Sequence, residues 1–179
     1  MNECRTVRRV LILATDGFEQ CELLEPRKAL EAAGIETVVA SPKQGKIRGW
    51  HHHDWGQSVA VDAALGEVEA EDFDGLLLPG GQMNPDALRL EDEVLCLIEE
   101  FDAADKPIAA ICHGPSLLAE ADIVEGRGVT AWPSIRSDLE NAGAQVFDEG
   151  VLVDGNLITS RDSTDIPALS RALIDALGG

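Results

Sequence analysis

Short apolar runs alternate along this chain with longer segments whose apolar residues recur at helical spacing. The runs predict strands at residues 10–14, 35–40, 74–79 and 107–111. The helical spacing predicts helices at residues 19–33, 91–104, 134–142 and 165–177, with a shorter one around 117–119. Apolar strands that alternate with amphipathic helices favour an α/β protein, with a mostly parallel sheet and helices on both of its faces.

The remaining segments add smaller features to this pattern. Residues 151–158 predict a hairpin that turns at Asp154-Gly155-Asn156, and residues 129–132 predict a further short strand. Residues 43–60, rich in Gly, Trp and His, are either a loop or an antiparallel excursion. Pro26 lies inside the predicted helix 19–33, which therefore bends or restarts there. At roughly 100–200 residues per domain, residues 1–179 form a single domain.

The net charge of the chain limits the kinds of partner that it is expected to bind. It has 33 acidic residues against 14 basic ones and a net charge of −19. Nucleic acids and anionic membrane surfaces are bound by clustered Lys and Arg, so neither is expected as a partner. The acidic residues are scattered along the chain, which fits either adaptation to high salt or an ordinary acidic cytosolic protein.

The four cysteines, Cys4, Cys21, Cys96 and Cys112, show no zinc-binding spacing. No apolar run is long enough to span a bilayer, and residues 1–10 lack the pattern of a secretory signal with its cleavage site. We therefore expect a reducing, cytoplasmic location. Cys4, Cys21 and Cys96 are interpreted as small structural side chains.

Cys112 differs from the other three because it stands directly between a predicted buried strand and a helix. A nucleophile at such a strand–helix turn is exposed to the free N–H groups of the helix start. These N–H groups favour a thiolate over a thiol, so the sequence predicts a pKa below that of a free cysteine. Cys112 is the candidate nucleophile.

Other candidates follow the first and third apolar strands, whose carboxyl ends meet at the same edge of a parallel sheet. The N–H groups of Gly81 and His113 are candidates for an oxyanion hole. Glu19 is the candidate carboxyl partner of Cys112. A carboxyl near a thiolate has a raised pKa, and when protonated it would donate a hydrogen bond to the sulfur and move a proton.

The segments DGFEQCEL, LLLPGGQMNPDALR, AAICHGPSLLAE, TAWPSIRSDLENAGA and VLVDGNLITSR resemble the ThiJ/PfpI family, within the class I glutamine amidotransferase-like superfamily. The likeness spans about residues 7–177 and is strongest to PfpI-like intracellular proteases and general stress proteins. It implies a flavodoxin-like three-layer sandwich, a homodimer or higher homo-oligomer, and an oxidation-prone cysteine.

The resemblance also assigns roles to residues. It implies Cys112 as nucleophile, Glu19 as its carboxyl partner, His113 as base and Gly81 in the oxyanion loop. In PfpI-like proteases a Glu of the neighbouring subunit completes a triad, and Asp86 is the matching position here. Asp86 is one methylene shorter than that Glu, and its loop is slightly longer.

The positions of the histidines exclude glutamine amidotransferase activity and suggest a metal site as an alternative. The chain has four, at positions 51, 52, 53 and 113, and none follows residue 113. A glutamine amidotransferase needs a His-x-Glu pair after its cysteine, so that activity is excluded. Alternate histidines of 51–53 share a face and would be metal ligands. The interpretation preferred here is no metal, with Trp50 and Trp55 packed at a subunit contact.

These observations predict a cofactor-free thiol enzyme. The function expected is a glyoxalase or deglycase that acts on methylglyoxal-type reactive carbonyls. One alternative is a cysteine peptidase that uses Cys112 and His113 with Asp86 of a partner subunit. The other is a non-enzymatic redox sensor or stress-protective protein whose Cys112 is oxidised.

Overall fold

The computed structural model describes residues 7–179. Cys4, interpreted above as structural, lies outside these residues, as does most of the segment tested for a signal sequence. Among the described residues, no helix is long and apolar enough to cross a membrane.

A seven-stranded sheet forms the centre of the molecule, in the order β10-β11-β7-β6-β1-β2-β5. Its strands are β1 (Arg9–Leu13), β2 (Glu36–Ser41), β5 (Ala63–Ala64), β6 (Gly75–Leu78), β7 (Ile108–Ile111), β10 (Val151–Asp154) and β11 (Leu157–Ser160). Neighbouring strands are parallel except for the edge pair β10–β11, which is an antiparallel hairpin. The predicted mostly parallel sheet and hairpin are confirmed.

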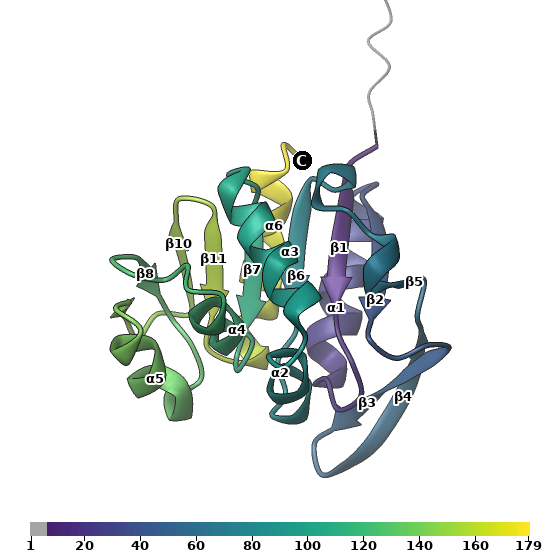
Figure 1. Ribbon diagram of the computed structural model, residues 1–179, viewed down its shortest axis with the longest axis horizontal. Helices are drawn as coiled ribbons and strands as arrows, with labels where there is room; N and C mark the ends of the chain where they lie inside the picture. The colour runs from purple at the N-terminus through teal and green to yellow at the C-terminus, as the bar shows by residue number, and fades with distance from the viewer. Residues whose placement is uncertain (1–6) are drawn as a thin grey trace, which may run out of the picture.

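Helices cover both faces of this sheet (Figure 1). One face packs against α1 (Gln20–Ala32) and α6 (Ile166–Ala176). The other packs against α2 (Met83–Leu88), α3 (Asp92–Ala103), α4 (Pro115–Glu120) and α5 (Arg136–Asn141). The three-layer sandwich is therefore confirmed. The helix α1 runs without interruption through Pro26.

Side-chain alternation along the strands divides the core between these two faces. In β1, Leu11 and Leu13 belong to the cluster under α3, whereas Val10 and Ile12 belong to the cluster under α1. Successive side chains of a strand point to opposite faces, so a strand buried on both faces is apolar at every position. This explains why the central strands are continuous apolar runs in the sequence.

Two predictions for the smaller elements are refined. Residues 43–60 contain an antiparallel hairpin of β3 (Lys46–His51) and β4 (Asp54–Ala60), in which Trp50 is paired with Trp55. The predicted strand 129–132 is reduced to β8 (Gly128–Val129), which pairs with β9 (Gln145–Val146) in a separate small sheet. Neither segment joins the central sheet.

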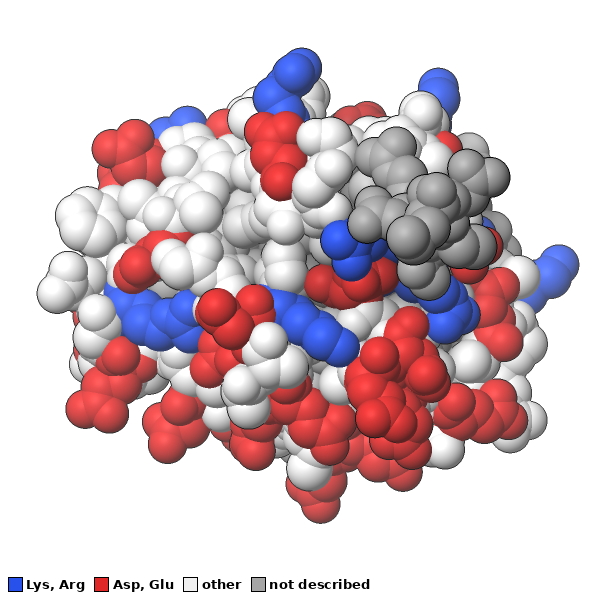
Figure 2. Space-filling view, turned by 90° about the horizontal axis from the view of Figure 1, so that it is seen from above, with Lys and Arg blue, Asp and Glu red and all other residues white. Residues whose placement is uncertain are grey.

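The carboxyl ends of β1, β6 and β7 lie at the lower end of the sheet in Figure 1. The opposite end, at the amino ends of the strands, is shown in Figure 2, where acidic side chains predominate over basic ones. The three loops that carry the candidate residues therefore meet at one end of the molecule, as the sequence predicts.

Candidate active site

Cys112 lies at a sharp turn between β7 and α4. Its backbone has a φ of 60°, in the left-handed region that L-residues rarely adopt. Its N–H donates to the carbonyl of Ser160 at 3.0 Å, and its carbonyl accepts from the N–H of Trp132 at 3.0 Å. A Cβ on Gly114 would lie 2.6 Å from the carbonyl oxygen of Leu78, so only glycine fits the next step of the turn. The predicted strand–Cys–helix turn is present.

The carboxyl hydrogen-bonded to Cys112 belongs to Glu22, not to Glu19 as expected. Glu22 stands in the first turn of α1, is 1% exposed, and accepts a hydrogen bond from the N–H of Gly80 at 2.7 Å. Glu19 precedes the helix in an extended conformation and acts on Cys112 through its charge. Both carboxyls line the cleft, but Glu22 is buried and Glu19 is partly exposed.

The sequence does hold a signal for this arrangement. Glu22, Pro26 and Leu30 are spaced by four residues, and all three are buried in α1. Residues at this spacing share one face of a helix. A carboxyl in line with two core residues is therefore identifiable from the sequence as a buried one.

Burial dominates the ionisation of this pair. It raises the pKa of Glu22 to about 8, against the opposing effect of the Gly80 N–H. It also raises the pKa of the Cys112 thiol, and the negative charge of Glu22 raises it further, whereas the N–H of His113 lowers it. The thiol pKa predicted from the turn alone is therefore wrong in direction, because burial and the neighbouring carboxylate outweigh the backbone N–H.

The raised pKa of Glu22 has a chemical consequence. Below about pH 8 this carboxyl holds its proton, and a protonated carboxyl is a hydrogen-bond donor. In that state Glu22 carries no negative charge that would repel a thiolate on Cys112. Glu22 and Cys112 therefore form a coupled pair, in which the ionisation of each group shifts the pKa of the other.

The loop after β6 brings glycine backbone close to this pair. Gly81 has a φ of +83°, and a Cβ there would lie 2.6 Å from the carbonyl oxygen of Gly17. Asn84 holds the loop: its side chain is fully buried, accepts from the N–H of Thr15 at 2.8 Å, and donates to the carbonyl of Pro79 at 2.9 Å. The sequence analysis did not identify Asn84. Its only signal in the sequence is that a polar residue stands in the short segment between a predicted buried strand and the next predicted helix.

His113 lies beside the nucleophile. Its Nδ1 is 3.3 Å from the sulfur of Cys112, its Nε2 is 3.4 Å from the hydroxyl of Ser134, and its ring stacks on that of Trp132. Burial lowers its pKa, which favours the neutral imidazole. Sequence reasoning did not identify Trp132 or Ser134, because they follow β8 and reach the site only through the tertiary fold.

Asp86 lies outside this group. It occupies the exposed side of α2 and is not among the residues that line the cleft around Cys112. Among residues 7–179, the hydrogen-bond partners of the His113 ring are Cys112 and Ser134, so a carboxylate there would have to come from another chain.

A cleft of about 590 Å³ lies beside Cys112 and His113. Its walls are Gly17, Glu19, Cys21, Glu22, Trp50, His52, His53, Gly81, Gln82, Met83, Cys112, His113, Trp132, Asp162 and Ser163. Burial raises the pKa of Glu19, and the charge of His52 followed by its backbone N–H opposes this increase. Across residues 7–179, no group of three His, Cys, Asp or Glu side chains is placed to hold a metal ion.

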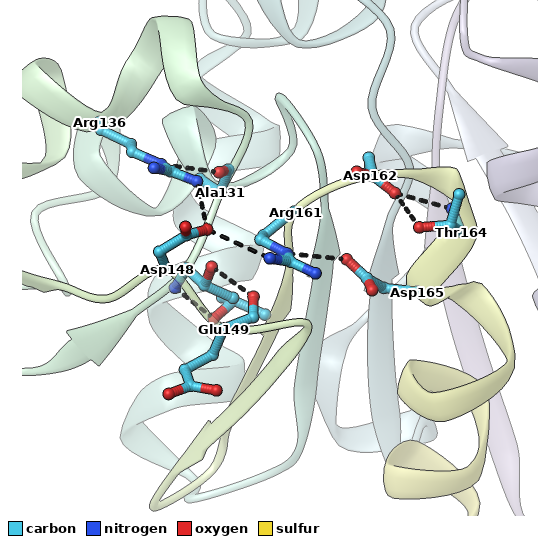
Figure 3. Close-up of polar contacts among 10 residues, drawn as sticks. Ala131, Arg136, Asp148, Glu149, Arg161, Asp162, Thr164 and Asp165 are labelled. Atoms are coloured by element: carbon cyan, nitrogen blue, oxygen red, sulfur yellow. Dashed lines mark hydrogen bonds and ion pairs between the residues drawn. The ribbon is translucent and has the colours of Figure 1, made fainter.

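An ion-pair network connects two of the segments that form this cleft (Figure 3). Asp148 pairs with Arg136 at 3.0 Å and with Arg161 at 3.2 Å, and Arg161 also pairs with Asp165. Arg136 belongs to the segment that follows Trp132, and Arg161 precedes Asp162. The network therefore connects the two segments that bring Trp132 and Asp162 to the cleft.

Residues 8–176 match the model of the DJ-1/PfpI family. The chain belongs to this family. The resemblance found in the sequence motifs is thus confirmed over nearly the whole chain. The DJ-1/PfpI fold places Cys112, Glu22 and the Gly81 loop at one end of a parallel sheet.

Relatives with about 40% sequence identity include a deglycase, a candidate cysteine protease and a general stress protein. A deglycase of Thermococcus kodakarensis is 41% identical over 169 residues, which are 94% of this chain and 99% of that protein. A candidate cysteine protease of Bacillus subtilis is 40% identical, with 95% and 98% covered. General stress protein 18 of Bacillus subtilis is 42% identical, with 92% and 94% covered.

A solved structure agrees with the fold. The crystal structure of DJ-1beta from Drosophila melanogaster superposes with a TM-score of 0.87 at 29% identity, covering 97% of this chain and 91% of that one. The family membership therefore extends from sequence motifs to the three-dimensional arrangement.

Proposed function

We propose that this protein is a cofactor-free thiol enzyme of the stress response that removes methylglyoxal-type reactive carbonyl adducts. The observation that carries the proposal is the buried, hydrogen-bonded pair of Cys112 and Glu22 on the wall of a small cleft. A cleft of about 590 Å³ has the size typical of small-molecule sites. The deglycase and stress-protein names of relatives support the same function.

An adduct first reverts to the free aldehyde, its hydroxyl proton passing to the amine or thiol that leaves. The thiol of Cys112 then adds to this aldehyde, which is the first step on the enzyme. As the sulfur of Cys112 bonds to the aldehyde carbon, the thiol proton passes to the neutral His113 ring, whose Nδ1 lies 3.3 Å away, and the carbonyl π-electrons move to oxygen. The N–H groups of Gly81 and His113 stabilise the oxygen while it is negative. Glu22, which holds a proton below about pH 8, donates it to this oxygen and becomes a carboxylate. The product is a hemithioacetal.

The second step moves one proton between neighbouring carbons. The Glu22 carboxylate removes the proton from the carbon bonded to sulfur, and the resulting enediol is protonated on the next carbon. This internal redox exchange gives a thioester. Water attacks the thioester and releases a hydroxy acid, and one proton of that water goes to the sulfur of Cys112. The proton taken up by His113 returns to Glu22, so the overall change is addition of one water.

The proposal is tested with the reduced protein and methylglyoxal, by following the hydroxy acid formed with proton NMR. We expect turnover by the native protein and by Cys21→Ser, and none by Cys112→Ser. The Cys21 variant is the matched control, because Cys21 lines the same cleft. Turnover that survives in Cys112→Ser contradicts the proposal.

A second candidate is a cysteine peptidase, which the 3.3 Å contact between Cys112 and His113 favours. It needs a carboxylate to orient His113, and the exposed Asp86 is free to supply one within a homo-oligomer. Release of peptides from a labelled unfolded protein, lost in Asp86→Asn, would support it. Sedimentation that shows only monomers excludes this arrangement.

The compartment follows from the chemistry proposed. Cys21, Cys96 and Cys112 are all free thiols. A nucleophilic thiol has to stay reduced, so we place the enzyme in the cytoplasm.

A further inference from the structure

We propose that the cleft selects positively charged substrates over neutral and anionic ones. This inference rests on the function proposed above and names the substrate class of the same site: carbonyl adducts attached to a cationic group. Three carboxyl groups line the cleft, those of Glu19, Glu22 and Asp162. None of the described residues that line it is Lys or Arg.

The positive charge nearest in sequence is directed away from the cleft. Arg161 precedes Asp162, but its guanidinium pairs with Asp148 and Asp165 (Figure 3). Asp162 instead accepts hydrogen bonds from the backbone N–H and the hydroxyl of Thr164. Neutral donors leave its charge in place, so Asp162 presents a negative charge at the cleft that Arg161 does not neutralise.

Aromatic walls add a second attraction for cations. Trp50 and Trp132 both line the cleft, and Trp132 is 39% exposed. The face of an indole ring attracts cations, and it does so more strongly where water is excluded. Carboxylates combined with indole faces suit a quaternary ammonium or guanidinium group and disfavour a carboxylate or phosphate.

Of the two partly exposed carboxyls in the cleft, Glu19 and Asp162, we expect Asp162 to contribute more to the preference for cations. Burial raises the pKa of Glu19, and the charge of His52 and its backbone N–H already act against this effect. The net charge of −19 adds a long-range attraction for cations over the whole molecule. The attraction of a cation by Asp162 has to be distinguished from the attraction by the net charge of the whole molecule. Two variants that each lose one negative charge, one inside the cleft and one far from it, make this distinction.

Charged thiol reagents test the inference without requiring turnover. Trimethylammonium-ethyl, methyl and sulfonato-ethyl methanethiosulfonates all form a mixed disulfide with Cys112 and release methanesulfinate. The cation-to-anion ratio of rates at Cys112, measured by mass spectrometry at pH 8, is compared with the ratio for 2-mercaptoethanol. We expect an excess of about tenfold or more, since a unit charge within several ångströms of a carboxylate is stabilised by this order in a partly buried site.

Two variants locate the effect. Asp162→Asn removes the charge yet keeps a side chain that caps the turn well, and we expect it to lower the ratio by about threefold or more. Glu71→Gln removes the same charge from an exposed site before β6, at the opposite end of the strands, and should leave the ratio unchanged. A ratio equal to that of 2-mercaptoethanol, or an equal loss in both variants, overturns the inference.

Turnover gives an independent measurement. Methylglyoxal hemithioacetals of thiocholine, 2-mercaptoethanol and mercaptoacetate share one reacting carbon and differ in charge. We expect kcat/KM to fall in the order cationic, neutral, anionic, and the order to flatten in Asp162→Asn. Equal turnover of all three overturns the charge selection alone. Absence of turnover with all three contradicts the proposed function, while the reagent ratio still decides the charge selection.

Discussion

Glu22, in the first turn of α1, is hydrogen-bonded to Cys112 at the end of β7. The two residues come from distant parts of the chain, and the N–H of Gly80 holds the carboxyl in place from a third loop at 2.7 Å. The reaction proposed above depends on that contact, because a protonated Glu22 carries no charge that would repel a thiolate, whereas an ionised Glu22 does.

The two glutamates at the start of α1 should differ in their effect on catalysis. Glu22→Gln keeps a hydrogen-bond donor next to Cys112 but removes the acid–base group, so we expect kcat to fall by about 10²–10⁴-fold. Glu19→Gln should change turnover of a neutral adduct by less than about tenfold, because Glu19 acts on the sulfur only through its charge. Steady-state kinetics on both variants measures this, and the reverse ranking would return the proton transfer to Glu19.

Glu22 should also make stability depend on pH. Its pKa is raised from 4.5 to about 8 in the folded protein, so the folded state holds this proton more tightly than the unfolded state does. The stabilisation is complete below about pH 4.5 and is lost as the pH rises to about 8. Relative to Glu22→Gln, the native protein should lose on the order of a few kcal/mol of unfolding free energy across this range. Urea unfolding at pH 5 and pH 8 tests it; parallel pH profiles for the two proteins contradict it.

The reactivity of Cys112 should depend on the proton of Glu22. At pH 7 the protonated carboxyl donates to the thiolate, so Glu22→Leu should slow alkylation of Cys112 by iodoacetamide. An ionised Glu22 would have the opposite effect, because removing its charge would lower the thiol pKa and speed alkylation. Peptide mass spectrometry of partly alkylated protein measures the rate, with the exposed Cys96 as an internal reference. Faster alkylation of the variant would show that Glu22 is ionised at this pH.

Asp86 separates the two candidate functions. It is exposed on α2 and lies away from the cleft, so Asp86→Asn should leave carbonyl turnover unchanged within about twofold. Hydrolysis of a peptide would instead fall severely if Asp86 of a neighbouring subunit orients His113. Both activities are assayed on one preparation. A severe loss of carbonyl turnover would place Asp86 in the reaction proposed here.

Local patterns were enough to predict the frame of this protein. The apolar runs at β1, β6 and β7 mark strands buried on both faces, and helical spacing marks α1, α3 and α6. The turn at Cys112 and the glycine loop at Gly81 were likewise identified, because a strand end followed by glycine or a helix is a local feature. Family motifs then linked these loops to one site.

Contacts between distant segments decided the rest. Whether Glu19 or Glu22 faces the sulfur depends on where α1 begins and how it lies on the sheet, a rotation of one turn that the motif DGFEQCEL does not state. The pKa of Cys112 depends on burial beneath several elements, which no single turn reveals. Trp132 and Asp162 line the cleft only because the tertiary fold brings together the segments after β8 and β11, which the ion pairs of Asp148 connect. The sequence by itself determined the strands, the turn and the candidate nucleophile. The tertiary structure determined which carboxyl lies beside that cysteine and which charges surround it, because both depend on packing and on the exclusion of water.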